Sequence, residues 1–138
     1  MIIKQIISSL FFLLIQLRGF LYWSGCFKQH SFNPPIISIG NVELGGTGKT
    51  PFIIFLSQYL KNKQISHVII SRGYKKRSAG LSVVSNTKKV LISNPDICGD
   101  EPLLIAKKCF TIPVLVCENK KRAISSSIEL FKPQIILL

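Results

Sequence analysis

The chain has 138 residues, which is enough for one domain and hardly for two. Hydrophobic residues make up 47% of the sequence and charged residues 17%, and this composition excludes an intrinsically disordered chain. The 18 lysines and arginines outnumber 6 acidic residues, giving a net charge of +12. That charge excludes an acidic solvating protein and indicates partners that carry phosphate, namely nucleotides, nucleic acid or anionic lipid.

Residues 1–25 are strongly apolar and are predicted to form a helix that lies in the membrane interface. The uncharged stretch between Lys4 and Arg18 is too short for a helix that crosses a bilayer, which needs about 20 residues. A signal peptide fits poorly, because no small-x-small cleavage site follows the apolar run. Tyr22 and Trp23 would sit at the lipid boundary. The alternative is a core helix that packs on the rest of the domain.

The four cysteines form no C-x-x-C pair and no zinc-like group with His30 or His67. They are predicted to be buried or incidental thiols in a reducing compartment, which indicates a cytosolic location. His67 is predicted to border a strand and to have no further role.

From residue 26 onward, apolar segments typical of strands alternate with segments typical of helices. A proline-rich linker at 33–35 precedes them, and a basic loop is expected at 74–80. The predicted strands are 36–39, 67–71, 112–116 and 134–138, the helices 49–63, 99–109 and 120–131, and a small hairpin pairs 81–85 with 89–92 around Asn86. This alternation predicts a three-layer α/β domain with a mainly parallel sheet.

A phosphate-binding loop is predicted at 45–50, because this segment follows a predicted strand and opens a helix. The glycines Gly45, Gly46 and Gly48 let backbone N–H groups approach phosphate oxygens, while Lys49 can reach the β- and γ-phosphates. The hydroxyl of the last residue is placed to bind Mg²⁺. The usual G-x-x-x-x-G-K-[ST] pattern has glycine where this chain has Glu43, so an incidental glycine-rich turn is the alternative.

Three ordered motifs carry a resemblance to a known family. They are SIGNVELGGTGKTP at 38–51, SRGY at 71–74 and GDEPLL at 99–104. With them the chain resembles the tetraacyldisaccharide 4'-kinase (lipid A 4'-kinase) family, which shares the departure at Glu43. The resemblance implies a P-loop NTPase-like fold. Family members are more than twice this length, so 26–138 is expected to be a partial, apparently truncated P-loop kinase domain.

The resemblance implies a kinase that moves the γ-phosphoryl group of ATP onto the 4'-hydroxyl of a tetraacylated glucosamine disaccharide 1-phosphate. This precursor of lipid A would be phosphorylated at the cytoplasmic face of the bacterial inner membrane by a peripheral or monotopic enzyme. The implied site is made of Gly45, Gly46, Thr47, Gly48, Lys49 and Thr50 on the ATP phosphates, Thr50 and Glu101 on Mg²⁺, Asp100 as base, and Arg72 and Tyr74 on a phosphate of the nucleotide or the acceptor.

Each of these roles has a plainer alternative. Asp100 and Glu101 also suit the first turn of a helix, where acidic residues are stabilising. Arg72 and Tyr74 also suit a solvated basic loop. Residues 75–77, which are Lys75, Lys76 and Arg77, either attract an anionic membrane surface or form a solvated run of charge.

The last predicted strand, 134–138, ends where P-loop proteins place a second metal motif. The resemblance implies an Asp-Asp pair there and a histidine from a later domain, and neither is within these 138 residues. We therefore expect weak ATP binding and no turnover from the 138-residue chain. One alternative function is a membrane-attached nucleotide-binding module without catalysis. Nucleic-acid binding is not expected, because no nucleic-acid-binding motif accompanies the positive charge.

Overall fold

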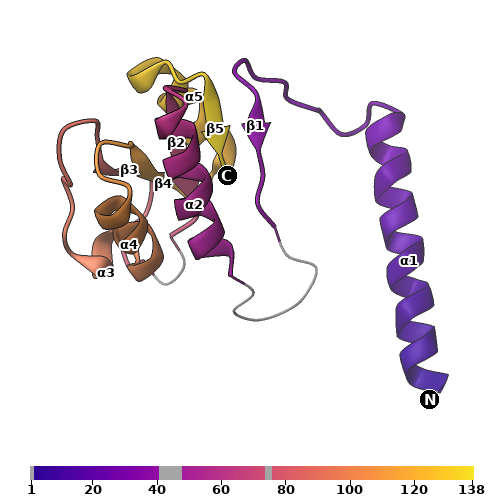
Figure 1. Cartoon of the computed structure of the whole chain (residues 1–138). Coiled ribbons are helices and arrows are strands. Elements are labelled where there is room, and N and C mark those ends of the chain that lie inside the picture. Colours follow the sequence, from indigo (N-terminus) through magenta and orange to yellow (C-terminus); the bar gives the residue numbers. More distant parts are fainter. Residues whose placement is uncertain (1, 41–47, 74–75) are drawn as a thin grey trace. The chain divides into compact units, whose positions relative to one another are not determined.

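The computed structural model describes residues 2–40, 48–73 and 76–138 (Figure 1). The chain divides into two compact units, Met1–Ser31 and Phe32–Leu138. The boundary falls a few residues beyond the predicted end of the N-terminal segment, just before the proline-rich linker.

The first unit contains one long helix, α1 (Ile2–Trp23). The helix continues through Arg18, because one long cationic side chain can extend its charged end to water without interrupting an apolar helix. Lys4–Trp23 comprises 20 residues with a mean hydropathy of 1.6, and none of it is buried. By length and composition α1 is therefore long enough to cross a membrane. Counting only the uncharged residues between Lys4 and Arg18 gave too short an apolar segment.

The second unit is built on a five-stranded sheet with the order β1-β5-β2-β4-β3. Its strands are β1 (Ile36–Ile37), β2 (His67–Ser71), β3 (Ser82–Ser85), β4 (Val114–Val116) and β5 (Ile135–Leu137). Strands β1, β5, β2 and β4 are parallel, and β3 pairs antiparallel with β4. The mainly parallel sheet predicted from the sequence is confirmed.

Helices cover both faces of the sheet, as the alternation of strands and helices predicted (Figure 1). On one face, Ile69 of β2 belongs to the same apolar cluster as residues of α2 (Lys49–Asn62) and α4 (Asp100–Lys108). On the other face, Val68 and Ile70 belong to a cluster with residues of α5 (Lys120–Phe131). Successive residues of β2 thus point to opposite faces, and the three layers share one buried central strand.

The predicted hairpin is present, and its first segment, β3, also pairs with a distant strand. The returning segment pairs with β3 through an antiparallel bridge between Ser85 and Val90 and a hydrogen bond from the Leu91 N–H to the Val84 carbonyl at 2.8 Å. Strand β3 also pairs with β4. The predicted turn at Asn86 is present, because its side-chain oxygen accepts hydrogen bonds from the backbone N–H groups of Lys88 and Lys89 at 2.8 Å. The prediction was therefore right for the turn and for the local pairing, and it missed the second, longer pairing of β3 with β4.

Two local features were missed. A short helix, α3 (Pro95–Cys98), precedes α4, and Asn94 caps it by accepting a hydrogen bond from the backbone N–H of Asp96 at 2.9 Å. His67 is the first residue of β2, at the border of the strand as predicted, and it is buried, with 3% of its surface exposed. The contact of its ring with another element was not predicted. Its ring reaches across to α2, as the Ser57 hydroxyl lies 2.8 Å from Nε2.

Candidate functional site

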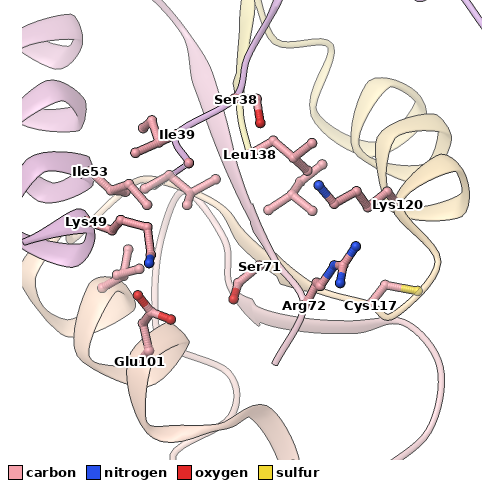
Figure 2. A pocket seen from close by; sticks show the side chains of 14 residues that line it. Ser38, Ile39, Lys49, Ile53, Ser71, Arg72, Glu101, Cys117, Lys120 and Leu138 are labelled. Carbon is pink, nitrogen blue, oxygen red and sulfur yellow. The ribbon is translucent and has the colours of Figure 1, made fainter. Parts of the chain in front are cut away.

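A cavity of about 300 Å³ lies where the parallel strands end (Figure 2). Side chains from the carboxyl ends of β1, β2, β4 and β5 line it together with residues of α2, α4 and α5. Its polar and ionisable lining residues are Ser38, Lys49, Ser71, Arg72, Glu101, Cys117 and Lys120. The carboxyl edge of a parallel sheet is the usual place for ligands in α/β proteins.

The predicted phosphate loop reaches this cavity through the start of α2. Gly48 caps the helix with φ 81°, a left-handed conformation that favours glycine, and its carbonyl accepts a hydrogen bond from the Phe52 N–H at 3.1 Å. Lys49 follows as the first helical residue and lines both this cavity and an adjoining one. Gly45, Gly46 and Thr47 lie outside the described residues.

The two predicted metal-binding side chains meet directly. The Thr50 hydroxyl donates a hydrogen bond to Oε1 of Glu101, although 51 positions separate them in the sequence. In Figure 2 the carboxylate of Glu101 lies on the same side of the cavity as the ammonium of Lys49. Hydroxyl and carboxylate oxygens are the ligand types that Mg²⁺ prefers, so this pair fits the metal. Within the described ranges no group of three or more His, Cys, Asp or Glu side chains is gathered.

Asp100 is placed differently from its neighbour. It is the first residue of α4, is exposed, and is not among the described residues that line the cavity. Gly99 precedes it with φ 91° and ψ 153°, a backbone conformation that glycine adopts far more readily than other residues. Both acids are exposed, and of the two only Glu101 is among the described residues that line the cavity.

On the opposite side of the cavity Arg72 leaves the end of β2. The next residue, Gly73, has φ 70°, and a Cβ atom there would lie 2.3 Å from Cγ1 of Val116. The chain can pass this close to β4 only because residue 73 is glycine. Arg72 is therefore held at the cavity by the backbone that follows it. Tyr74 lies outside the described residues.

Four polar or ionisable lining residues were not identified as site residues from the sequence, and the first of them, Ser38, directly follows β1. Ser71 ends β2, Cys117 directly follows β4, and Lys120 begins α5. In Figure 2 Lys120 and Arg72 extend into the same part of the cavity, across from Lys49. The missed residues lie at or just after the carboxyl ends of parallel strands. This position could have identified them from the sequence, since such residues gather at one edge of the sheet.

The basic loop after β2 is bound to the domain, contrary to one expectation. The Lys76 side chain is 3% exposed and its Nζ lies 2.9 Å from Oε1 of Glu118. Arg77 remains exposed and its Nε lies 3.7 Å from Oδ1 of Asp96. Both alternatives given for Lys76, a membrane-binding residue and a solvated one, are wrong, because its side chain is buried and pairs with Glu118. Lys75 lies outside the part of the chain that the structure describes.

This sheet order, with a phosphate-loop motif between β1 and α2, defines an α/β protein of the P-loop NTPase-like class. A family model described as tetraacyldisaccharide-1-P 4'-kinase matches residues 2–138, and the chain belongs to this family.

Named relatives agree with this assignment. The chain is 43% identical over 133 residues to a tetraacyldisaccharide 4'-kinase of Flavobacterium psychrophilum, covering 95% of this chain and 37% of the relative. It is 35% identical to the kinase of the same name from Aquifex aeolicus, covering 41% of it. The crystal structure of the "apo" form of LpxK from Aquifex aeolicus in complex with ATP matches with a TM-score of 0.81 at 34% identity, over 95% of this chain and 41% of that one. The chain thus spans about two fifths of the length of these relatives.

Proposed function

We propose that the chain binds ATP in this cavity and contributes to the phosphorylation of the 4'-hydroxyl of a tetraacyldisaccharide 1-phosphate. The observation that carries the proposal is the contact between Thr50 and Glu101, beside Lys49. It brings the end of the GKT motif together with the GDEP motif, as a shared site for nucleotide phosphates and metal requires. The ATP in the similar LpxK structure and the family supply the rest of the support.

In this mechanism the phosphates of ATP bind against residues 45–50 and the ammonium of Lys49 neutralises charge on the transferring group. Thr50 and Glu101 would hold Mg²⁺, which when bound supplies further charge neutralisation. The acceptor's 4'-oxygen forms a bond to the γ-phosphorus while the bond from that phosphorus to the leaving oxygen of ADP breaks. Asp100 takes the proton of the 4'-hydroxyl. Arg72 and Tyr74 are proposed to contact a phosphate of the nucleotide or the acceptor.

The first unit is proposed to attach the protein to the cytoplasmic face of the bacterial inner membrane. The exposed apolar residues of α1 support this, since an acylated acceptor resides in the bilayer. Co-sedimentation of the chain with anionic vesicles tests it. We expect Phe12→Asp in α1 to reduce binding and Leu130→Asp in α5, at a similarly exposed apolar position, to leave it unchanged. Equal binding by both variants would contradict an anchoring role for α1.

Titration calorimetry with ATP and Mg²⁺ tests the nucleotide site. We expect Lys49→Ala to weaken binding at least tenfold, while Lys63→Ala, after the far end of α2, serves as a control of equal charge. Binding that is unaffected by Lys49→Ala would contradict the proposal. Transfer of labelled γ-phosphate to the acceptor is measured separately, with and without Asp100→Asn.

The second candidate function is a membrane-attached nucleotide-binding module without catalysis. It is favoured by the exposed position of Asp100, which the cavity lining does not include. ATP binding without phosphate transfer would support this candidate. Transfer that Asp100→Asn abolishes, with ATP binding retained, would exclude it.

A further inference from the structure

Lys76 and Glu118 form a closed set of interactions that joins two segments of the second unit. The Lys76 ammonium donates to the Gly80 carbonyl at 2.7 Å and pairs with Oε1 of Glu118 at 2.9 Å. The other carboxylate oxygen of Glu118 accepts a hydrogen bond from the Gly80 N–H at 3.1 Å. This hydrogen bonding by Lys76 lowers the pKa of Glu118 below its ordinary value. The carboxylate therefore stays ionised and bound to the loop.

The two residues differ in burial, and the difference matters. The side chain of Lys76 is 3% exposed, whereas that of Glu118 is 55% exposed. A charge is rarely buried without a partner. An ion pair with a half-exposed member contributes little net stability, because water screens it. Stability alone therefore does not explain why Lys76 is buried. The segments that the pair joins suggest another role.

Each member of the pair lies close in sequence to a cation of the cavity. Lys76 is four positions after Arg72, and Glu118 is two positions before Lys120. Arg72 enters the cavity from the end of β2, and Lys120 enters it from the start of α5. The Lys76–Glu118 pair thus connects the two walls from which these cations extend.

Gly73 and Lys76 are also joined through their backbones. Gly73 lies against Val116 at the end of β4, and the Lys76 N–H donates to the Gly73 carbonyl at 3.1 Å. A displacement of Lys76 would therefore also displace Gly73 and, with it, Arg72. The exposed pair between Arg77 and Asp96 lies in the same loop but is bound to α3, which contributes no residue to the cavity lining described above.

We infer that Lys76 and Glu118 are positioning residues that set the spacing of Arg72 and Lys120 for binding a phosphate group in the cavity. Two cations at a fixed separation bind an anion better than two mobile ones, because less side-chain and loop freedom is lost on binding. The phosphate belongs either to the nucleotide or to the acceptor, since both carry one. This inference rests on the proposed function, because it presupposes a phosphate ligand in the cavity.

The test uses the full chain and two probes, a non-hydrolysable ATP analogue with Mg²⁺ and a glucosamine disaccharide 1-phosphate without acyl chains, added after the analogue. Lys76→Met removes the ammonium and keeps the buried apolar stem, so the loop remains packed. Arg77→Met is the matched control, with the same loss of charge in the same loop. We expect Lys76→Met to weaken one of the probes about tenfold and Arg77→Met to leave both unchanged. The probe that is weakened identifies the source of the phosphate.

A second variant and a double mutant separate positioning from general stability. Glu118→Gln keeps a half-exposed side chain that can still accept from Gly80, so it remains folded, and it should weaken the same probe. If Lys76 acts through Arg72, then Lys76→Met adds little to the loss caused by Arg72→Gln, whereas independent effects would add. Additive losses, or equal binding by the Lys76→Met and Arg77→Met variants, would overturn the inference. If the wild-type chain binds neither probe, both the proposed function and this inference are wrong. If it binds a probe that Lys76→Met does not weaken, only the inference is wrong.

Discussion

The hydroxyl of Thr50 donates a hydrogen bond to the carboxylate of Glu101, and this contact joins the first turn of α2 to the first turn of α4. The two helices lie on the same face of the sheet and share one apolar cluster. The position of the contact therefore depends on how α2 and α4 pack on β2. In this way the core of the domain sets the geometry of its polar site.

Replacing Thr50 with valine tests whether this hydroxyl serves a metal. Valine has nearly the same shape and lacks the oxygen, so the fold is preserved while one Mg²⁺ ligand is lost. We expect Thr50→Val to weaken ATP binding about tenfold in Mg²⁺ and to leave binding in a chelator unchanged. Calorimetric titrations under both conditions measure the difference. Thr87→Val, at an exposed turn position, is the control. A Thr50→Val variant with wild-type affinity in Mg²⁺ would show that the hydroxyl is not a ligand.

Gly73 provides a test of the close approach between the loop after β2 and the end of β4. A Cβ atom at this position would lie 2.3 Å from Cγ1 of Val116, 2.7 Å from Cδ of Lys76 and 3.3 Å from the carbonyl oxygen of Cys98, and φ is 70°. An alanine here would create both a steric overlap and a strained φ, and the backbone has to move to relieve them. We expect Gly73→Ala to lower the free energy of unfolding by about 2–4 kcal/mol, measured by urea denaturation.

Gly80 offers a matched control for that experiment. Its φ is 87°, but a Cβ atom there would meet nothing within 4 Å. Gly80→Ala therefore carries the cost of the left-handed conformation alone, about 1 kcal/mol. Equal losses for the two alanine variants would mean that the contact with Val116 contributes nothing and that the loop relaxes freely.

The sequence predicted the layers, the parallel strands and the helix starting at Lys49, because each of these depends on local periodicity and on motifs that lie within a few residues. It did not predict that β3 pairs with β4, since that pairing joins segments about 30 residues apart and is decided by burial in the sheet. Motifs also predicted Glu101 as a metal ligand and Asp100 as a base, and Glu101 lines the cavity. They could not indicate which of the two acids lines the cavity, because the direction of each side chain follows from where α4 begins.

Lys76 shows a different limit of sequence reasoning. In the sequence it is one of three consecutive basic residues, and such a run is usually solvated. Its burial depends on Glu118, which lies 42 positions later, beyond the reach of local patterns. Lys120 was overlooked for the related reason that its role depends on strand order. The environment of such residues is decided by a partner far away in the sequence, so a local pattern predicts only what residues of that type usually do.

His67 makes the stability of the second unit depend on pH. Its Nδ1 lies 3.0 Å from the carbonyl oxygen of Ile65, which can only accept, so Nδ1 carries the proton of the neutral ring. Its Nε2 then accepts from the Ser57 hydroxyl at 2.8 Å. Burial lowers the pKa of His67 below its ordinary value of 6.5, against a smaller opposite effect of the hydrogen bond to Ile65. The folded protein thus holds a neutral imidazole that the unfolded chain would protonate.

The unfolded state binds this proton more tightly than the folded state. The stabilisation that neutral His67 gives the fold is therefore fully present above pH 6.5 and is lost as the pH falls from 6.5 through the lowered pKa. We expect the free energy of unfolding, from urea denaturation, to be about 1 kcal/mol lower at pH 5.5 than at pH 7.5. His67→Gln should remove most of that difference, whereas His30→Gln, in the first unit, should retain it. Glu118 does not interfere, because its pKa lies below its ordinary 4.5 and it titrates at more acidic pH. A pH dependence that persists in the His67→Gln variant would mean that another group is responsible.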